Sequence, residues 1–251
     1  MVSVTRDSSV VLWTIDRPNA KNAIDEATFT ALLQAAREAN EDKTIRAAIL
    51  TGTGDTFVSG GDLRELRDKT SRADAERLSD IGFSYTELIG ALPFPVIAAL
   101  SGPAIGGGAE LAVACDLRIA DPRASLAFKQ GRMGVTTAWG GTARLLSLVS
   151  EGTAARLLYA GHEIFAEEAK TLGLVDAVCE EGAAVTTALA WARDIERASP
   201  LAVVSMKRLV RSGVGTDLRT LERASFVETW TSADHREAVE AYFASRKPTW
   251  G

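Results

Sequence analysis

The chain has 251 residues, enough for one large domain or for one domain with an appendage. Hydrophobic residues make up 46% of it and charged residues 24%, a balance that excludes intrinsic disorder. The formal net charge of −5 argues against a nucleic-acid-binding or membrane-surface protein, because both classes need a basic surface. The first residues hold no apolar signal-peptide core, and Cys115 and Cys179 stand in apolar sequence as expected for reduced, buried thiols. We therefore expect a cytoplasmic enzyme without nucleic-acid or membrane partners.

The first two thirds of the chain alternate between strand-like and helix-like segments. Alternating β-branched residues predict a hairpin, Asp25 is a candidate helix N-cap, and Pro93 and Pro95 end a long helical pattern. In chain order we expect a hairpin over 2–16, a helix after Asp25, a strand over 45–51, a helix over 73–92, a strand over 96–101, a helix beginning at Gly106 and a strand over 117–120. This alternation predicts an α/β fold with right-handed crossovers.

From about Ala183 the pattern becomes helical, with almost no strand signal. We expect helices over 183–198, 201–212 and 217–246, so that residues 1–195 form the core domain and 196–251 a helical C-terminal region. The last of these helices carries more apolar side chains than a terminal helix usually exposes, namely Leu218, Leu221, Phe226, Trp230, Ala238 and Tyr242. Such a face is expected to be buried within or between subunits.

Two segments combine a strand, a run of glycines and the beginning of a helix: residues 57–63 (FVSGGDL) and 95–111 (PVIAALSGPAIGGGAEL). Glycine lets a backbone approach a ligand closely, and the first N–H groups of a helix have no partner inside it. These groups suit an anion, and a pair of them, one from each segment, would form an oxyanion hole. Close packing of a helix on a strand explains the same glycines, so both interpretations stay open at this point.

Glu110 lies in the first turn of an otherwise apolar helix. It is either a surface carboxylate that compensates the helix dipole or an acid/base group that faces the glycine pocket. Asp116, which ends the apolar run, is expected to satisfy backbone donors near a turn. A dinucleotide-binding loop is disfavoured because Phe57 stands where a third glycine is needed, and the two histidines, His162 and His235, are too far apart in sequence to suggest a metal site.

The order and spacing of several motifs resemble the crotonase (enoyl-CoA hydratase/isomerase) superfamily over nearly the whole chain. The matching motifs are Arg17-Pro18-x-Ala-x-Asn22-Ala23, Ser59-Gly60-Gly61-Asp62-Leu63, Pro95-Val96-Ile97-Ala98-Ala99, Gly106-Gly107-Gly108-Ala109-Glu110-Leu111, Cys115-Asp116-Leu117-Arg118-Ile119-Ala120, Gly140-Gly141-Thr142-Ala143-Arg144-Leu145, Ala166-Glu167-Glu168-Ala169, Gly173-Leu174-Val175 and Arg246-Lys247-Pro248. The resemblance implies an α/β spiral of ββα turns with a helical C-terminal trimerisation region. It also implies an acyl-CoA thioester substrate, no cofactor beyond the coenzyme A of that substrate, and a homotrimer or a dimer of trimers.

The family pattern assigns roles to residues of both glycine segments. The N–H groups of Gly61 and Gly107 would hold the thioester oxygen, and the oxyanion would be a thioester enolate. The resemblance places the substrate and its coenzyme A against Lys21, Ala23, Gly60, Asp62, Leu63, Arg64, Gly106 and Trp139. Among these, Lys21 and Arg64 are the nearest basic candidates for the coenzyme A phosphates, and the alternative is that both are solvated surface cations.

One position departs from the family pattern. Hydratases of the family use two glutamates, the first at the position of Glu110 and the second twenty residues on, where this chain has Gln130. Glutamine can orient water or a carboxylate but cannot transfer a proton. The segment from Phe128 to Gly134, followed by Trp139, looks more like ethylmalonyl-CoA decarboxylase and its bacterial relatives. Trp139 itself is expected to be an acyl-pocket wall or a core residue.

We therefore predict an acyl-CoA lyase or isomerase with weak or absent hydration of crotonyl-CoA. The catalytic set would be Glu110, Gly61, Gly107 and Gln130. One alternative is a malonyl-type decarboxylase acting on ethylmalonyl- or methylmalonyl-CoA, since loss of CO₂ leaves the same enolate. The other is a non-catalytic protein that binds CoA esters, and Glu110 argues against it because a binder has no need of an acid/base group.

Overall fold

The structure is a computed structural model that describes residues 1–212 and 216–250. Its core contains a six-stranded sheet in the order β1-β2-β3-β4-β6-β9 and a three-stranded sheet in the order β5-β7-β8. In the larger sheet only the β1–β2 hairpin is antiparallel. The strands are β1 (Val2–Asp7), β2 (Val10–Ile15), β3 (Ala47–Gly52), β4 (Val96–Leu100), β5 (Ala104–Ile105), β6 (Leu117–Ala120), β7 (Ser125–Ala127), β8 (Glu163–Phe165) and β9 (Ala177–Val178).

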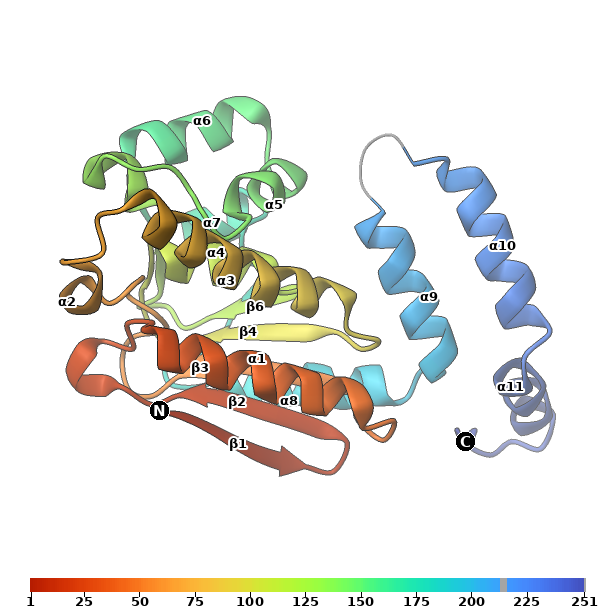
Figure 1. The fold of residues 1–251 in the computed structure, drawn as a ribbon. Coiled ribbons are helices and arrows are strands. Elements are labelled where there is room, and N and C mark those ends of the chain that lie inside the picture. Colours follow the sequence, from red (N-terminus) through yellow and green to blue (C-terminus); the bar gives the residue numbers. More distant parts are fainter. Residues whose placement is uncertain (213–215, 251) are drawn as a thin grey trace.

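Helices cover both faces of the larger sheet (Figure 1). They are η1 (Pro18–Ala20), α1 (Glu26–Glu41), α2 (Leu63–Leu66), α3 (Arg72–Ala91), α4 (Gly107–Ala114), η2 (Lys129–Met133), α5 (Gly141–Leu148), α6 (Glu151–Ala160), α7 (Ala166–Thr171), α8 (Ala184–Glu196), α9 (Pro200–Arg211), α10 (Leu218–Trp230) and α11 (Ala233–Phe243). In β3, Ile49 faces α8 while Leu50 faces the core cluster that includes α1 and α3. Every residue of β3 is buried for this reason, and its sequence AAILTG begins with four consecutive apolar residues.

The predicted elements of residues 2–120 are confirmed within one or two residues at most ends. Asp25 caps α1 by accepting a hydrogen bond from the Thr28 N–H at 2.7 Å. Asp116 is structural as expected, because its carboxylate accepts from the Val96 N–H at 2.8 Å. The strands of the smaller sheet have two or three residues each, too few to show a periodic pattern, and were not anticipated.

Two sequence-based predictions were wrong in detail. The expected helix over 217–246 is divided into α10 and α11, because the Ser232 hydroxyl accepts from the His235 N–H at 3.1 Å and begins a new helix. Of the two thiols expected to be buried, only Cys115 is, and burial raises its pKa to about 12; Cys179 is partly exposed. Within the described residues, no helix is both long and apolar enough to cross a membrane.

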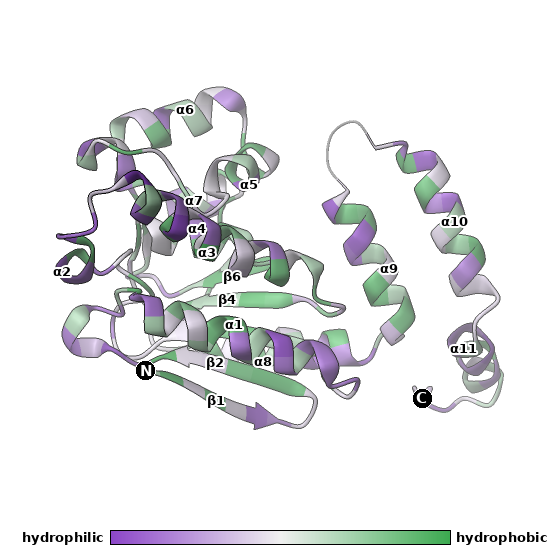
Figure 2. Cartoon of the chain, in the orientation of Figure 1, coloured by the Kyte–Doolittle hydropathy of each residue, from purple (hydrophilic) through white to green (hydrophobic). Residues whose placement is uncertain are grey.

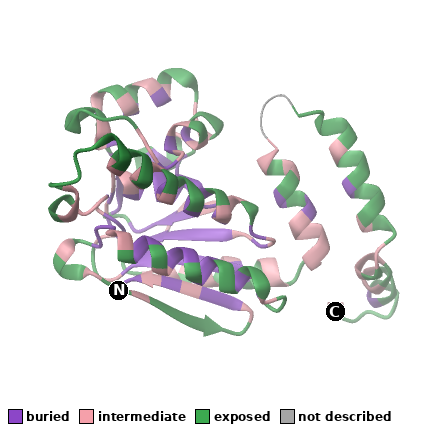
Figure 3. Ribbon diagram, viewed as in Figure 1, coloured by how far each residue is buried: buried purple, intermediate pink, exposed green. Residues whose placement is uncertain are grey.

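The last three helices stand to one side of the core, and α10 and α11 bury few of their residues (Figures 1 and 3). Helix α9 joins the core through Asp116, which pairs with Lys207 at 2.9 Å and with Arg211 at 2.7 Å. The Lys207 ammonium also donates to the carbonyls of Ile89 and Phe94, at 3.0 and 2.8 Å. The buried Lys207 ammonium and the half-buried Asp116 carboxylate therefore fix where the C-terminal helices leave the core.

Candidate active site

A cavity of about 400 Å³ lies where the two glycine segments meet the 129–139 loop. It brings together many of the residues predicted for the site: Gly60, Gly61, Leu63, Gly106, Gly107, Glu110, Gln130 and Trp139. The remaining lining residues are Ser59, Leu66, Leu78, Ile105, Lys129, Met133, Val135, Thr136 and Ala138. Residues from four segments of the chain, 59–66, 78, 105–110 and 129–139, thus surround one cavity.

The two glycine segments adjoin each other. The Ile105 N–H donates to the carbonyl of Val58 at 2.8 Å, and a Cβ on Gly60 would lie 3.6 Å from the Gly107 nitrogen. Gly60 has a φ of +106°, a conformation that a side chain rarely allows. Gly107 is the first residue of α4, so its N–H has no partner inside the helix.

Gly61 pairs with Ile24 in a short parallel bridge that uses the flanking backbone groups of residues 60 and 62. Across residues 1–212 and 216–250, no protein oxygen accepts a hydrogen bond from the N–H of Gly61 or of Gly107. Two backbone donors beside the same cavity therefore remain available for an oxygen of a ligand. That both bind one thioester oxygen stays a prediction.

The Glu110 side chain is 2% exposed and lines this cavity. Its Oε2 accepts from the N–H groups of Trp139 and Gly141, at 2.8 and 2.9 Å. Its Oε1 accepts from the Gln130 amide at 2.7 Å and from the Ala138 N–H at 3.3 Å. A carboxylate offers about four acceptor positions, so all of them are occupied in this arrangement.

Burial raises the pKa of Glu110 above its ordinary value, and the hydrogen bonds from residues 130, 138, 139 and 141 offset only part of this effect. A carboxyl group with a raised pKa holds its proton to a higher pH. The proton-accepting form therefore disappears as the pH falls through that raised value. Such a group is suited to proton transfer at moderate pH.

Gln130 lies beside Glu110, as the twenty-residue spacing of the family predicts. Its Nε2 must face the carboxylate, because the carbonyl oxygen would meet Glu110 as a second acceptor. The Gln130 Oε1 is buried, and no group of the described residues donates to it. Gln130 is thus a fixed hydrogen-bond donor to the only carboxylate among the residues that line the cavity.

The other residues assigned to the coenzyme A side do not line the cavity. Lys21 and Arg64 are exposed, and Ala23 is buried in the segment that pairs with residues 59–62. The Asp62 carboxylate accepts from the Arg64 N–H at 3.1 Å and pairs with Arg17 at 2.8 Å, and the hydrogen bond from Arg17 holds its pKa below the ordinary value. The Asp62 carboxylate is therefore engaged in contacts within the protein, where it caps α2.

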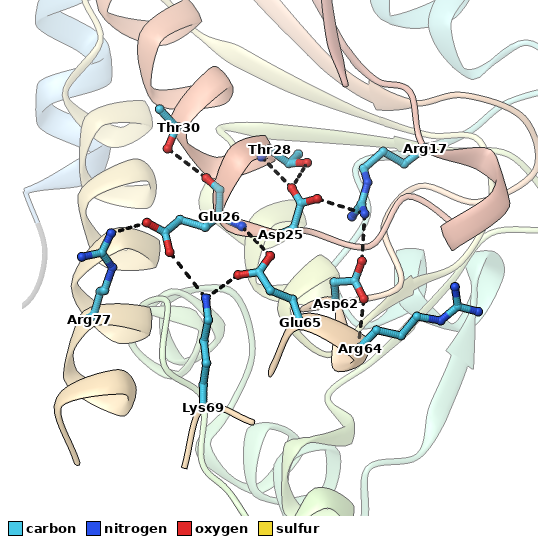
Figure 4. A network of polar contacts seen from close by, with 10 residues as sticks. All are labelled: Arg17, Asp25, Glu26, Thr28, Thr30, Asp62, Arg64, Glu65, Lys69 and Arg77. Atoms are coloured by element: carbon cyan, nitrogen blue, oxygen red, sulfur yellow. Dashed lines mark hydrogen bonds and ion pairs between the residues drawn. The ribbon is translucent and has the colours of Figure 1, made fainter. Parts of the chain in front are cut away.

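A polar network braces the segment that follows Gly61 (Figure 4). Lys69 pairs with Glu65 and also with Glu26, which in turn pairs with Arg77 of α3. The Glu26 N–H donates to Glu65 at 3.1 Å. Helix α1, helix α2 and helix α3 are tied together by these contacts, next to the cavity wall formed by Leu66 and Leu78.

Sequence reasoning missed the backbone donors and part of the apolar wall. The N–H groups of Ala138 and Gly141 hold Glu110, but a backbone group leaves no sequence signal of its own. Gly141 does carry a signal, because a Cβ there would lie 2.5 Å from Glu110 Cγ. Leu78 reaches the cavity from α3 and has only the ordinary periodicity of an amphipathic helix.

Comparison with known proteins identifies the class to which this fold and site belong. The family model described as enoyl-CoA hydratase/isomerase matches residues 5–251. A short-chain-enoyl-CoA hydratase of Clostridium acetobutylicum is 33% identical, covering 98% of this chain and 95% of its own. A crotonyl-CoA hydratase of Syntrophomonas wolfei is also 33% identical, covering 98% and 96%. The crystal structure of an enoyl-CoA hydratase from Bacillus anthracis superimposes with a TM-score of 0.95 at 32% identity, covering 99% of this chain and 98% of that one.

The chain therefore belongs to the enoyl-CoA hydratase/isomerase family of the crotonase superfamily. The predicted α/β fold with a helical C-terminal region is confirmed. An enzyme of this family that acts on acyl-CoA thioesters is the class of protein that the fold and the site define.

Proposed function

We propose that the protein is an acyl-CoA lyase or isomerase that stabilises a thioester enolate and moves a single proton with Glu110. One observation carries the proposal: the buried Glu110 lines the same cavity as two adjoining glycine segments, in which the N–H groups of Gly61 and Gly107 donate to no oxygen of the described residues. Gly61 and Gly107 would donate to the thioester oxygen as negative charge develops on it.

Glu110 must release one hydrogen-bond donor before it can take a proton, because four donors already occupy its oxygens. The Ala138 N–H is the longest of these contacts, at 3.3 Å, and is the one expected to give way first. A small movement of the 134–138 loop would then open Oε1 towards the cavity while Oε2 stays fixed.

Hydration needs a water activated on one side and a proton delivered to the carbon next to the carbonyl. Gln130 cannot deliver or accept that second proton. We therefore expect weak hydration of crotonyl-CoA, although relatives of this chain are named hydratases. Decarboxylation of a malonyl-type thioester is the second candidate, since it generates the enolate without a base and needs one proton source.

The substrate's coenzyme A is proposed to lie along residues 21–24 and 62–64, with Lys21 and Arg64 near its phosphates. A Lys21→Ala/Arg64→Ala double variant should raise KM for an acyl-CoA and leave kcat nearly unchanged, as expected for uniform binding. Arg72→Ala is the control, because Arg72 is also exposed but pairs with Glu76 within α3. We further propose a homotrimer or a dimer of trimers in the cytoplasm, with no cofactor beyond the substrate's coenzyme A.

Turnover of a panel of thioesters tests the proposal. The panel contains crotonyl-CoA, a 3-enoyl-CoA, methylmalonyl-CoA and ethylmalonyl-CoA, each assayed with the wild type and with Glu110→Gln. Turnover of a 3-enoyl or malonyl-type thioester that is lost in Glu110→Gln supports the proposal. Crotonyl-CoA hydration at the efficiency of a good hydratase would contradict it, and binding without any turnover would leave a CoA-ester binding protein.

A further inference from the structure

The indole of Trp139 is wedged between two glycines on different helices. A Cβ on Gly82 of α3 would lie 1.9 Å from Trp139 Cδ1, and a Cβ on Gly107 of α4 would lie 1.9 Å from Trp139 Cζ3. Opposite edges of the ring therefore occupy the space that side chains at these two positions would need. Only glycine at 82 and at 107 admits the ring in this place.

The ring has little freedom to leave this slot. The backbone of Trp139 is held in place, because its backbone N–H donates to Glu110 Oε2 at 2.8 Å and its carbonyl accepts from the Thr86 hydroxyl at 2.7 Å. Phe29 packs edge-to-face on the indole, with ring centroids 4.7 Å apart. The residue is 4% exposed, so the wall that it forms is part of the packed core.

The residues that line the cavity differ in how far they are buried. At the Gly107 end the indole fills the volume beside the proposed oxyanion donor. Leu63, Met133 and Val135 also line the cavity, and they are exposed by 63%, 60% and 59%. A linear chain can leave past these three side chains, whereas a second substituent near Gly107 meets the ring.

We infer that Trp139 is a specificity-determining residue that restricts the substrate to acyl groups with one carbon substituent on the carbon next to the thioester carbonyl. This inference rests on the proposed function, because it takes the thioester oxygen to be held by the Gly107 N–H. The adjacent carbon then lies beside the indole, and a branch on it has no space. The inference also weighs against methylmalonyl- and ethylmalonyl-CoA as substrates, since each carries two carbon substituents there.

Binding of butyryl-CoA and isobutyryl-CoA tests the inference. The two thioesters are isomers that differ only in the branch, and both are saturated, so hydration and double-bond migration do not complicate the measurement. By isothermal titration calorimetry the wild type should bind butyryl-CoA at least about tenfold more tightly, a difference of about 1.4 kcal/mol. Trp139→Ala should bind isobutyryl-CoA more tightly, so that the preference for butyryl-CoA falls to about threefold or less. Trp250→Ala is the control, because Trp250 does not line the cavity, and it should keep the preference of the wild type.

Gly82→Ala provides an independent readout of the slot. In the wild type the new methyl group meets the indole, so the variant should lower the Tm and weaken the binding of both thioesters. In the Trp139→Ala background the same substitution meets open space and should leave the Tm unchanged or raise it, because alanine favours helix. If Trp139→Ala does not fold, Trp139→Phe replaces it and should show a preference between the two limits.

The outcomes separate this inference from the proposed function. Equal binding of the two isomers by the wild type, or an unchanged preference in Trp139→Ala, would overturn the role of Trp139. Failure of the wild type to bind either thioester would overturn the proposed function instead. If Gly82→Ala lowered the Tm equally in the wild type and in Trp139→Ala, the ring and this glycine would not interact.

Discussion

The core and the C-terminal helices of this protein differ in how far their apolar side chains are buried (Figures 2 and 3). Every residue of β3 and β4 is buried, whereas the described residues of α10 and α11 contribute one buried residue each. Phe226, Trp230 and Tyr242 are exposed by 59%, 57% and 79%. The central strands of the core complete their apolar contacts within one chain, while the C-terminal helices leave several large apolar side chains exposed, as an interaction surface does.

This comparison assigns separate tasks to the two regions. The cavity, the glycine segments and Glu110 all belong to the core. The aromatic surface belongs to the C-terminal helices, which the Asp116 ion pairs hold against the core. Variants in the core should therefore change catalysis and leave assembly nearly unaffected. Variants in the C-terminal helices should change assembly and leave catalysis nearly unaffected.

The largest effect is expected for Glu110→Gln. The substitution removes the one carboxylate of the cavity lining, so turnover of the true substrate should fall about 10²- to 10⁴-fold. Circular dichroism and the Tm control for folding, because the new amide must still fit the donors of residues 139 and 141. Undiminished activity would assign Glu110 a purely structural role and would contradict the assignment of the chemistry to this cavity.

Asp116→Asn tests the attachment of the C-terminal helices to the core. It leaves Lys207, which is 9% exposed, and Arg211 without their counter-charge. Removing one partner of a buried ion pair costs about 3–5 kcal/mol, and urea denaturation at fixed protein concentration would measure this loss. Arg156→Gln, which breaks the exposed pair with Glu168, is the control and should cost less than about 1 kcal/mol.

Trp230→Ser tests the aromatic surface as an assembly interface. A buried tryptophan at the centre of an interface contributes about 2 kcal/mol or more to binding, so the oligomer should dissociate at concentrations roughly thirtyfold higher than the wild type. Light scattering over a dilution series measures this shift. Tyr159→Ser removes an aromatic side chain of the core that is 83% exposed, and a similar shift in that variant would refute the contrast between the regions.

The smallest effect concerns the pH dependence. Burial raises the pKa of Glu110, and the Gln130 amide lowers it by donating to the ionised form. Gln130→Met removes that donor, so the pKa should rise further and the acid limb of kcat/KM should move to higher pH. The loss of one hydrogen bond of about 1 kcal/mol corresponds to a shift of about 0.7 pH units. A shift to lower pH would mean that Gln130 does not stabilise the carboxylate.

Much of the fold was predictable because its segments carry strong local signals. The hairpin, the N-cap at Asp25, the prolines after α3 and the glycines before α4 each act over a few residues. The break at Ser232 was missed, although a serine N-cap is a local signal, because the apolar periodicity continues through it. The short strands of the smaller sheet owe their existence to pairing partners far away in the chain.

By itself, the sequence determined the family, the two glycine segments and the replacement of a second glutamate by Gln130, since these are matters of residue identity and spacing. Only the tertiary structure decided that the carboxylate of Glu110 has all its acceptor positions filled, and that the ring of Trp139 fills the gap between Gly82 and Gly107. Gly141, one of the donors to Glu110, lies 31 residues after it in the chain. Gly82 on α3 and Gly107 on α4 are separated in the chain by β4 and β5. Close packing, which acts on atoms brought together from distant parts of the chain, sets such contacts, and no local pattern records them.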